Sequence, residues 1–517
     1  MSPVRNSQPS KLLTRASTGA ISNGVKRLVS RYRPRFVRSL VYMLQASEYD
    51  IRDYLAWVHR ASDFAHVEKR KTLVWSTKAK TLYAAAWASI VLWVVAITGV
   101  ANFTGSGMAL AVDAFALLLT PFLLPYMLAL LVVAGKVVQT PVEQTLIAQA
   151  KRKLRAHHAI KIAIAGSYGK TSMREILKTV LAEGKKVAAP PGSYNTPLGI
   201  SKFVRGLKGD EDVLIFELGE YYPGDISKLC ELVRPQWGII TGVNEAHLEK
   251  FGTLEKTAST IFELLDWLKK KPVFTRKGEH MKNGALYVNG ENIQARAKAH
   301  TGAILFSREG CGTSSSGWRV ENARTGIEGT SFILKQESGK AVRVSSKLLG
   351  LHMVGPLAAA ADIASRIGLT AEQIERGIQK TRPFEHRLEP KQWGDGVLLL
   401  DDSYNGNPDG AAAVIDFLGS IKARRRWYVT PGLVEMGART EEVHCAIGQQ
   451  LAGAGIEKVV LIRNSVTPHI ERGLKEAGYG GEILWYDDMP HALDALRSST
   501  VNEDVVLVQN DWPDQYA

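Results

Sequence analysis

The feature that most restricts the fold of this chain is an apolar run that leads through a Gly-rich turn into a helical pattern. The run IKIAIA, residues 160–165, is followed by GSYGKTS, residues 166–172, and by a helical pattern over about 170–183. A turn of this kind between a strand and a helix holds phosphate oxygens on backbone N–H groups and at the positive end of the helix. Here two residues separate the first Gly from the Gly-Lys pair, whereas the common phosphate loop has four. The stretch predicts an α/β nucleotide-binding domain with a shortened loop.

Short apolar runs alternate with helical patterns from residue 159 onward. The runs DVLIFELG and WGIITGV, residues 212–219 and 237–243, read as strands buried on both faces, which indicates a mostly parallel sheet covered by helices. Residues 300–347 are rich in Gly and Ser with short alternating strands, and they predict a small antiparallel addition. A second set of apolar runs follows the segment RPFEHRLEP, near residue 380, and predicts a second α/β domain.

Two long apolar segments precede these domains. Residues 82–101 carry no charge and residues 109–135 carry one, Asp113, and each is long enough to cross a bilayer as a helix. Lys and Arg flank the pair on both outer sides, while the intervening loop has none. The positive-inside rule then predicts a multi-pass protein of the cell membrane with its catalytic domains on the cytoplasmic face. The alternative is a pair of buried core helices.

The charge of the chain is concentrated near its start. The net charge is +14, and residues 1–80 hold 16 Lys and Arg against 5 Asp and Glu, a local excess of 16 − 5 = +11. Residues 1–25 are typical of a basic tail, whereas residues 26–38 predict attraction to an anionic membrane surface. Nucleic acid is not expected as a partner. The first 40 residues show no signal peptide, and three widely spaced cysteines predict neither disulfides nor a zinc site.

Four side chains are expected at the carboxyl edge of the first sheet. Lys170 would reach the β and γ phosphates of a nucleotide, and Thr171 would offer a hydroxyl to Mg²⁺. Glu217 ends a strand, where its carboxylate could ligate the same metal ion, although such a Glu is more often a solvated strand end. His247 follows the next strand, where a lone His is more often structural. Their convergence matters because α/β sheets bind ligands at that edge.

Taken together, several stretches resemble the Mur ligases, most closely the branch that adds D-alanyl-D-alanine to the cell-wall precursor. By themselves, DDSYNGNPDG and VEMGARTEEVH would read only as loops. The resemblance covers roughly residues 158 to 510, and its signatures in chain order are GSYGKTS, SYNTPLGI, ELGEYYPGDI, AHLEKFGTLE, HRLE, DDSYNGNPDG and VEMGARTEEVH.

The resemblance implies a central ATPase domain with a phosphate loop, a Rossmann-like C-terminal α/β domain, and ATP-dependent formation of an amide bond through an acyl phosphate. Lys170, His247 and Arg387 would be catalytic, and Thr171, Glu217 and His247 would hold Mg²⁺. The residues implied in ATP binding are Gly166, Ser167, Tyr168, Gly169, Lys170, Thr171, Ser172, Arg387, Asp402 and Asn405. The predicted organisation is a basic segment (1–80), a transmembrane hairpin (81–136), a linker (137–157), the central domain (158–382) and the C-terminal domain (383–517).

The chain departs from the family pattern in several places. The Asn expected before EAH is Gly242, and Asn244 stands two residues later. Both Asn positions of the central HNxxN motif are changed, to Met353 and Pro356, and the family's carbamylated Lys falls on Ile261. The basic pair expected late in the chain is absent from QNDWPDQY. The resemblance implies a soluble, UDP-binding domain before the central domain, and the stretches before residue 158 do not resemble one.

These departures leave the substrates open. The expected partners are a UDP- or lipid-linked cell-wall precursor, an amine such as D-alanyl-D-alanine, and membrane lipids. One alternative is an amide ligase for another membrane-linked carboxylate. The other is a non-catalytic, ATP-binding membrane scaffold of cell-wall synthesis.

Overall fold

The computed structural model describes residues 25–510. These residues divide into two compact units, with the boundary between residues 142 and 143. Within that range the description leaves out residues 48, 62, 66, 68–71, 105–106, 193, 247, 271–272, 275–279, 282–284, 314–315, 395 and 405. Two of the predicted site residues, His247 and Asn405, therefore lie outside the described residues. Each unit is considered by itself.

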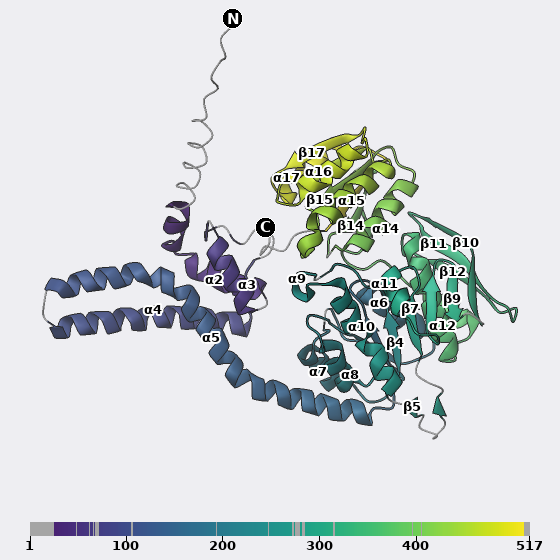
Figure 1. Ribbon diagram of the computed structural model, residues 1–517, viewed down its shortest axis with the longest axis horizontal. Helices are drawn as coiled ribbons and strands as arrows, with labels where there is room; N and C mark the ends of the chain where they lie inside the picture. The colour runs from purple at the N-terminus through teal and green to yellow at the C-terminus, as the bar shows by residue number, and fades with distance from the viewer. Residues whose placement is uncertain are drawn as a thin grey trace, which may run out of the picture. The chain divides into compact units, whose positions relative to one another are not determined.

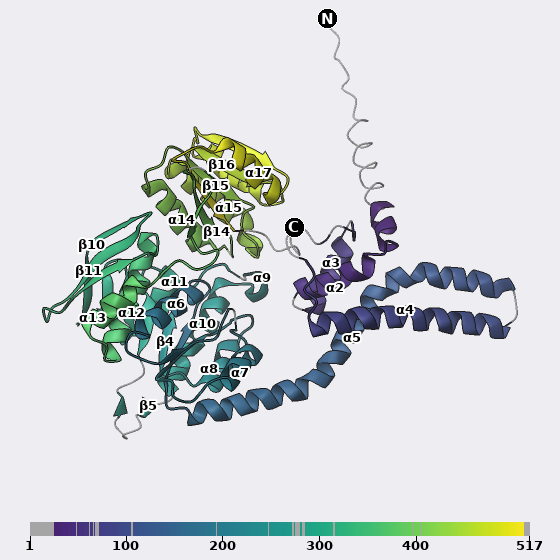
Figure 2. The same ribbon diagram turned by 180° about the vertical axis from the view of Figure 1, so that it is seen from behind.

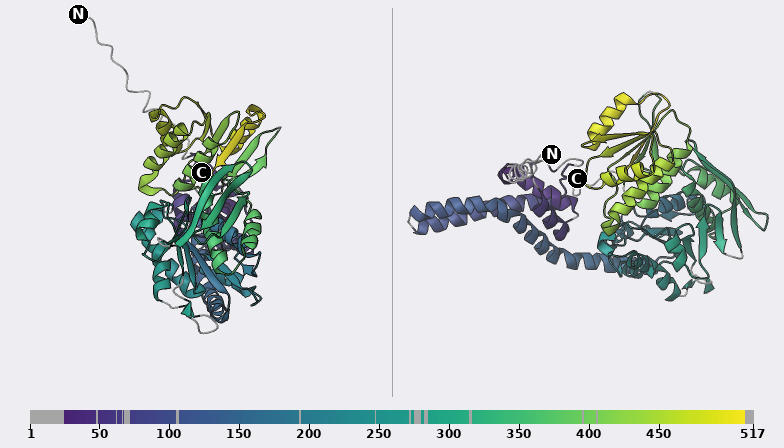
Figure 3. Two further views of the ribbon diagram at one scale, coloured as in Figure 1. Left: turned by 90° about the vertical axis from the view of Figure 1, so that its right-hand side faces the viewer. Right: turned by 45° about the horizontal axis from the view of Figure 1, so that its top comes forward.

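The first unit is helical. Its helices are α2 (Phe36–Ala46), α3 (Ile51–Arg60), α4 (Thr77–Thr104) and the first part of α5 (Gly107–Ala156). Helices α4 and α5 lie side by side as a hairpin, drawn in purple and blue in Figures 1 and 3. Parts of both pack into the unit's own core, where Leu82 of α4 and Leu128 of α5 are buried with Leu40 and Tyr54. Helix α5 continues through residues 137–156, which the sequence assigned to a linker.

Two helical segments in the described part of the chain, Thr77–Gly99 and Ala114–Val137, are long and apolar enough to cross a membrane. Length and composition are the basis of that statement, and a core helix of a soluble protein or a signal sequence meets the same test. The helices predicted from the sequence are therefore present, whereas their placement in a bilayer is not established.

The second unit contains the predicted mostly parallel sheet with its antiparallel addition. Strands β2, β3, β1, β4, β7 and β8 are parallel, and β9 to β12 extend the same sheet in antiparallel fashion. Their bounds in sheet order are β2 (Val187–Ala188), β3 (Val213–Glu217), β1 (Ile160–Ala165), β4 (Trp237–Ile240), β7 (Leu286–Asn289), β8 (Ile304–Ser307), β9 (Gly310–Thr313), β10 (Ser316–Gly326), β11 (Gly329–Gln336) and β12 (Ala341–Ser346). The short strands β5 (Val273–Phe274) and β6 (His280–Met281) pair with each other.

Helices cover both faces of this sheet, as the apolar strands predicted. Alternate side chains of β1 enter two different cores: Ile162 and Ile164 pack on one face, and Ala163 and Ala165 on the other. The helices are α6 (Lys170–Leu181), α7 (Pro197–Arg205), α8 (Asp225–Val233), α9 (Leu248–Phe251), α10 (Leu254–Lys270), α11 (Ile293–Lys298), α12 (Val354–Arg366) and α13 (Ala371–Gln379), with the 3₁₀ turn η1 (Leu351–Met353). Helices α6, α12 and α13 belong to the first core, and α7, α8 and α10 to the second.

A second sheet follows and confirms the second α/β domain. Its order is β13-β14-β18-β15-β16-β17, and all of its neighbouring strands are parallel except β13 and β14. The strands are β13 (Glu389–Gln392), β14 (Leu398–Asp402), β15 (Arg426–Thr430), β16 (Lys458–Ile462), β17 (Glu482–Tyr486) and β18 (Val505–Gln509). The helices are α14 (Pro408–Ser420), α15 (Thr440–Gly453), α16 (Thr467–Glu476) and α17 (Met489–Ser499), with the 3₁₀ turn η2 (Gly437–Arg439). Helices α14 and α15 lie beside this sheet (Figure 2).

The register of the first sheet places the predicted site at one edge. Ile164 pairs with Glu217 and Ala165 pairs with Ile240, so β1, β3 and β4 end at the same level. Because parallel strands point their carboxyl ends the same way, the loops after these three strands meet there. The phosphate loop, Glu217 and Thr241 therefore share one edge.

Candidate nucleotide site

The phosphate loop is held against the end of β4. Gly166 has φ +141°, and a Cβ there would lie 2.2 Å from Thr241 Oγ1. Gly169 has φ +74° and directly precedes α6. Both positions require glycine, the first because of its close neighbour and both because of their backbone conformation. The Thr241 hydroxyl donates to Ala165 O at 3.2 Å and also to Tyr168 O, so the loop is shaped before a ligand arrives.

Lys170, the first residue of α6, is held by two groups of the protein. Its Nζ donates to Gly166 O and to both carboxylate oxygens of Glu220, at 2.8 and 3.0 Å. The side chain of Glu220 is 2% exposed. An ammonium group has three N–H donors, so a phosphate must share Lys170 with Glu220 or displace it. The sequence analysis did not single out Glu220, although it lies three residues after Glu217 in the same stretch.

Thr171 and Glu217 lie together, as predicted for a metal site. The Thr171 hydroxyl donates to Glu217 Oε2 at 3.1 Å. The other oxygen, Oε1, lies 2.8 Å from Arg174 Nη1, yet it accepts no hydrogen bond from the described residues. Burial raises the pKa of the Glu217 carboxyl, and Arg174 and Lys170 act in the opposite direction. A buried carboxylate with an oxygen lacking a hydrogen bond, next to a hydroxyl, is a donor set that suits Mg²⁺.

Among the residues that the structure describes, this pair is not part of a larger set of metal-binding side chains. Within the described residues no group of three or more His, Cys, Asp or Glu side chains could hold a metal ion. His247, the third predicted ligand, lies outside the described residues. Ile261 is buried in the core on α10 and offers no ligand atom. Substrate phosphates and water would supply further ligands of a bound Mg²⁺, which is how Mg²⁺ is usually held.

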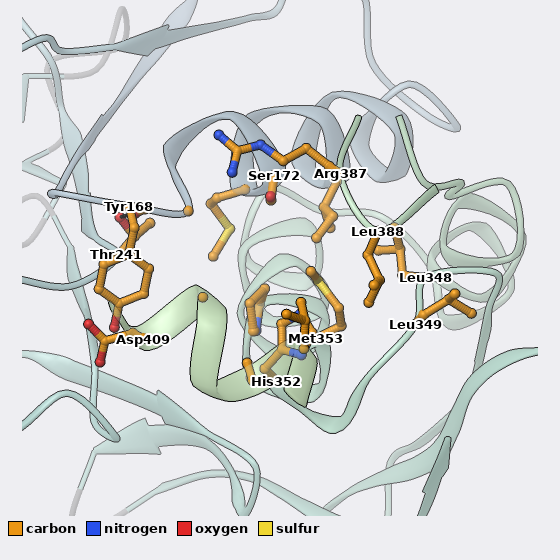
Figure 4. A pocket seen from close by; sticks show the side chains of 18 of the residues that line it. Tyr168, Ser172, Thr241, Leu348, Leu349, His352, Met353, Arg387, Leu388 and Asp409 are labelled. Atoms are coloured by element: carbon orange, nitrogen blue, oxygen red, sulfur yellow. Dashed lines mark hydrogen bonds between the residues drawn. The ribbon is translucent and has the colours of Figure 1, made fainter. Parts of the chain in front are cut away.

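A cavity of about 530 Å³ opens beside the loop and is lined by both sheet domains of the second unit. Figure 4 shows that Tyr168, Thr241 and Asp409 lie at one end of it. At the other end are three leucines, Leu348, Leu349 and Leu388. One end is therefore polar and adjoins the phosphate loop, and the other is apolar. That gradient suits a ligand with a phosphate group at one end and a flat apolar ring at the other.

The two altered positions of the HNxxN motif, Met353 and Pro356, also line the cavity. His352 lines it beside them, and burial lowers the pKa of its imidazole to about 4, so this ring is neutral near pH 7. Met353 and Pro356 replace the two amide side chains of that motif. The structure places them at the cavity wall, where they provide an apolar surface in place of two amides.

Arg387 and Asp402, two of the residues implied in ATP binding, both line the cavity. The guanidinium of Arg387 lies over the Tyr404 ring, 4.7 Å from its centroid. Asp402 Oδ1 accepts a hydrogen bond from Leu388 N at 3.1 Å. Burial raises the pKa of Asp402 to about 7, although the charge of Arg387 lowers it. Burial also lowers the pKa of Arg387, partly offset by Asp402. The charge of each side chain thus favours the charged form of the other, whereas burial of both side chains disfavours it.

Asp402→Asn is expected to flatten the pH dependence of stability. Because the pKa of this carboxyl is about 7 in the folded chain against an ordinary value of 3.8, the folded state binds more protons between these pH values, and stability falls as pH rises through them. From pH 5 to pH 8 the wild-type free energy of unfolding should fall by about 2–3 kcal/mol more than that of the variant. Denaturation at both pH values checks this. An equal fall in both proteins would contradict the buried carboxyl.

The sequence analysis also missed residues that join the two sheet domains. Asn244 Nδ2 donates to Asn407 Oδ1 at 2.9 Å and to Asp409 Oδ2 at 2.7 Å. Arg439 forms an ion pair with Glu245. A signal for one of them was present, since Asn followed by Pro is typical of a helix start, and Asn407 is the N-cap of α14.

Comparisons with known proteins agree with this architecture. The chain matches the model of the Mur ligase middle domain over residues 164–364 and that of the Mur ligase glutamate ligase domain over residues 386–509. It is 29% identical to a UDP-N-acetylmuramoyl-tripeptide--D-alanyl-D-alanine ligase of Mycobacterium tuberculosis (strain CDC 1551 / Oshkosh), over 67% of this chain and 69% of that protein. A ligase of the same name from Escherichia coli (strain K12) is 28% identical over 58% of this chain and 64% of that protein.

A solved structure shows the same fold. The crystal structure of a MurF ligase from Thermotoga maritima in complex with ADP superposes with a TM-score of 0.59, covering 71% of this chain and 80% of that one at 23% identity. The chain thus spans roughly two thirds to four fifths of the length of these proteins. Residues 1–163, which include the first helical unit, lie before the matched domains.

The predicted localisation, a multi-pass protein of the cell membrane with catalytic domains on the cytoplasmic face, is wrong. The matched relatives are named for a UDP-linked tripeptide, and such a nucleotide-linked precursor is water-soluble. The two apolar helices meet a test that core helices also meet, and they bury part of their surface in their own unit. The same finding removes the basis for expecting membrane lipids as partners.

Proposed function

The chain belongs to the Mur ligase family of ATP-dependent amide-bond ligases, and from that membership we propose that it adds D-alanyl-D-alanine to a UDP-linked muramoyl tripeptide in peptidoglycan synthesis. The observation that carries the proposal is the shortened phosphate loop at the polar end of a cavity between the family's two domains. The relatives' names supply the choice of carboxylate and amine.

The reaction joins a carboxylate to an amine in two steps. The carboxylate attacks the γ-phosphorus of ATP, ADP leaves and an acyl phosphate forms; the amine then attacks the acyl carbon, and phosphate leaves with formation of the amide. Both reactants of the first step are anions, so their repulsion has to be neutralised. Residues 166–172 would hold the phosphates on backbone N–H groups, and Lys170 would supply the positive charge.

The remaining residues would orient the nucleotide. Arg387 and Asp402 would hold it from the C-terminal domain, and the leucines at the apolar end of the cavity would cover its base. Thr171 and Glu217 would hold Mg²⁺, which when bound neutralises phosphate charge and steadies the leaving group. His247 and Asn405 keep the roles that the resemblance implies. The bounds of the central and C-terminal domains, 158–382 and 383–517, form part of this proposal.

Coupled turnover with defined substrates tests the function. The full-length chain is incubated with ATP, Mg²⁺, UDP-N-acetylmuramoyl-tripeptide and D-alanyl-D-alanine, and the products are followed by mass spectrometry and by release of ADP and phosphate. We expect an acceptor heavier by the dipeptide less one water, with equal amounts of ADP and phosphate. Reactions that lack either the tripeptide or the dipeptide should release neither at a comparable rate.

The same assay separates the alternatives. Phosphate release that requires a different carboxylate or amine would retain the ligase chemistry and replace the substrates. Binding of ATP without turnover, with any acceptor tried, would favour the non-catalytic scaffold. Absence of nucleotide binding would contradict the site itself.

A further inference from the structure

The turn after β4 contains two of the departures from the family pattern, Gly242 and Asn244, and the structure gives them a common cause. Gly242 has φ +153°, and a Cβ there would lie 2.4 Å from the Tyr168 ring. The ring of Tyr168 thus occupies the space that a side chain at position 242 would need. A side chain that reaches out of this turn has to start from another position, and Asn244 does so.

Asn244 is buried, with 3% of its surface exposed, and all polar atoms of its side chain are bonded. Its Nδ2 donates one hydrogen to Asn407 Oδ1 at 2.9 Å and the other to Asp409 Oδ2 at 2.7 Å. Its Oδ1 accepts from Ala246 N at 3.1 Å. An amide group has two donors and one acceptor oxygen. The side chain therefore sits in a site built for an amide.

The two acceptors belong to the start of α14, in the C-terminal domain. Asn407 is the N-cap of α14, and its Oδ1 also accepts from Gly410 N at 2.9 Å. Asp409 is in the first turn and lines the cavity. Figure 4 shows the Tyr168 hydroxyl pointing toward Asp409. Asn244 is thus hydrogen-bonded to the start of α14, which lies at the polar end of the cavity.

The other side of Asn244 is joined to the phosphate loop. Its backbone N donates to Ser167 Oγ at 3.3 Å, and Ser167 N donates to Gly242 O at 2.9 Å. The ion pair between Glu245 and Arg439 lies next to Asn244 in the chain and spans the same domain boundary. These contacts connect the phosphate loop through the turn to α14.

We propose that Asn244 is a positioning residue. Its hydrogen bonds form a latch between the phosphate loop and the C-terminal domain, and this latch holds the start of α14 against the polar end of the cavity. The ligation role of this latch rests on the function proposed above. Asn244 has no hydrogen bond to Lys170, Thr171 or Glu217 among the described contacts, so it acts through α14. Its loss should impair turnover and leave the affinity for nucleotide nearly unchanged.

Hydrogen exchange on the full-length chain tests the latch directly. In Asn244→Gly, the amides of residues 409–412 should exchange at least about 10-fold faster than in wild type, both without nucleotide and with ADP and Mg²⁺, because the start of α14 loses two of its hydrogen bonds. The dissociation constant for ADP should change by less than about threefold, and kcat should fall about 10- to 100-fold. Asn322→Gly, an exposed Asn of β10, is the matched control and should leave all three readings at wild type.

Swapping the amide and the carboxylate between positions 244 and 409 distinguishes a latch from a general loss of structure. Asn244→Asp places a carboxylate against Asp409 and should behave like Asn244→Gly or worse, because two like charges then face each other. Adding Asp409→Asn restores an amide–carboxylate pair and should recover most of the protection. Exchange within twofold of wild type in Asn244→Gly, or no recovery in the double variant, would overturn the latch. Absence of ligation in wild type would contradict the proposed function, while the exchange without nucleotide would still decide the latch.

Discussion

Lys170→Ala is expected to lower ATP-dependent ligation by roughly 10³-fold while the chain stays folded, because a preorganised charge aimed at the reacting phosphate is lost. Lys170 starts α6 and projects into the loop, where Gly166 O and Glu220 hold it. The loop, residues 166–172, contains no other Lys or Arg. The measurement is kcat/KM for phosphate release at saturating Mg²⁺ with both acceptors present.

Removal of Lys170 also leaves Glu220 buried without its cation, and a buried unpaired charge destabilises a protein. The double variant Lys170→Ala, Glu220→Gln removes that second effect. If the loss of activity reflects the phosphate contact, it should persist in the double variant while the thermal stability returns toward wild type. Lys178→Ala, on the same helix with a half-exposed side chain, is the control and should keep wild-type activity. Activity of Lys170→Ala within threefold of wild type would exclude the assigned role.

Glu217→Gln is expected to lower turnover by about 10²- to 10³-fold and to raise the Mg²⁺ concentration for half-maximal rate at least about 10-fold. The substitution keeps the shape and the possible hydrogen bond from Thr171, so it removes mainly the negative charge. A titration of turnover with Mg²⁺ separates the two effects, since a metal ligand changes the Mg²⁺ requirement and a purely structural Glu does not.

The affinity for a metal ion can be measured without turnover. Binding of Mn²⁺ to the chain in the presence of ADP, followed by electron paramagnetic resonance, should weaken by a similar factor in Glu217→Gln. Glu231→Gln on α8, whose exposed side chain pairs with Lys151, should leave Mn²⁺ binding and turnover unchanged. An unchanged Mn²⁺ affinity in Glu217→Gln would show that Glu217 serves the fold and would leave Thr171 without its assigned partner.

The two predictions share a physical basis, which is the cost of gathering anions at one edge of a sheet. A triphosphate and a carboxylate have to meet beside Glu217 and Glu220, both of which are buried. Lys170, Arg174, Arg387 and a bound Mg²⁺ would help to balance these negative charges. The close pairing of Lys170 with Glu220, and of Glu217 with Thr171 and Arg174, keeps these charges paired before substrates bind.

The amino-acid sequence by itself determined the phosphate loop, the alternation of strands and helices, and the two-sheet architecture. These features are indicated by patterns within short stretches of the chain, namely apolar runs, helical periodicity and turn residues. Gly166 and Gly169 provide the backbone conformations that the turn needs, and the apolar run before them makes a strand buried on both faces. The edge that carries Thr171 and Glu217 followed from the rule that parallel strands point their carboxyl ends the same way.

The sequence misled where composition was the main argument. Two apolar stretches of adequate length predicted a membrane protein, because length and hydropathy carry no information on what the side chains touch. Leu82 and Leu128 of these helices are buried in the core of their own unit. Nor does the local sequence indicate that Glu220 lies beside Lys170, because Lys170 follows β1 and Glu220 follows β3.

Only the tertiary structure decided how the two domains meet. Asn244 and Asp409 are 165 residues apart, and Glu245 and Arg439 are 194 apart, so no local pattern relates them. The same holds for Asp402, whose raised pKa arises from burial in a cavity formed by both domains. Hydrogen bonds and desolvation depend on distances of a few ångströms between distant parts of the chain, and those distances exist only after the two sheets have formed and packed together.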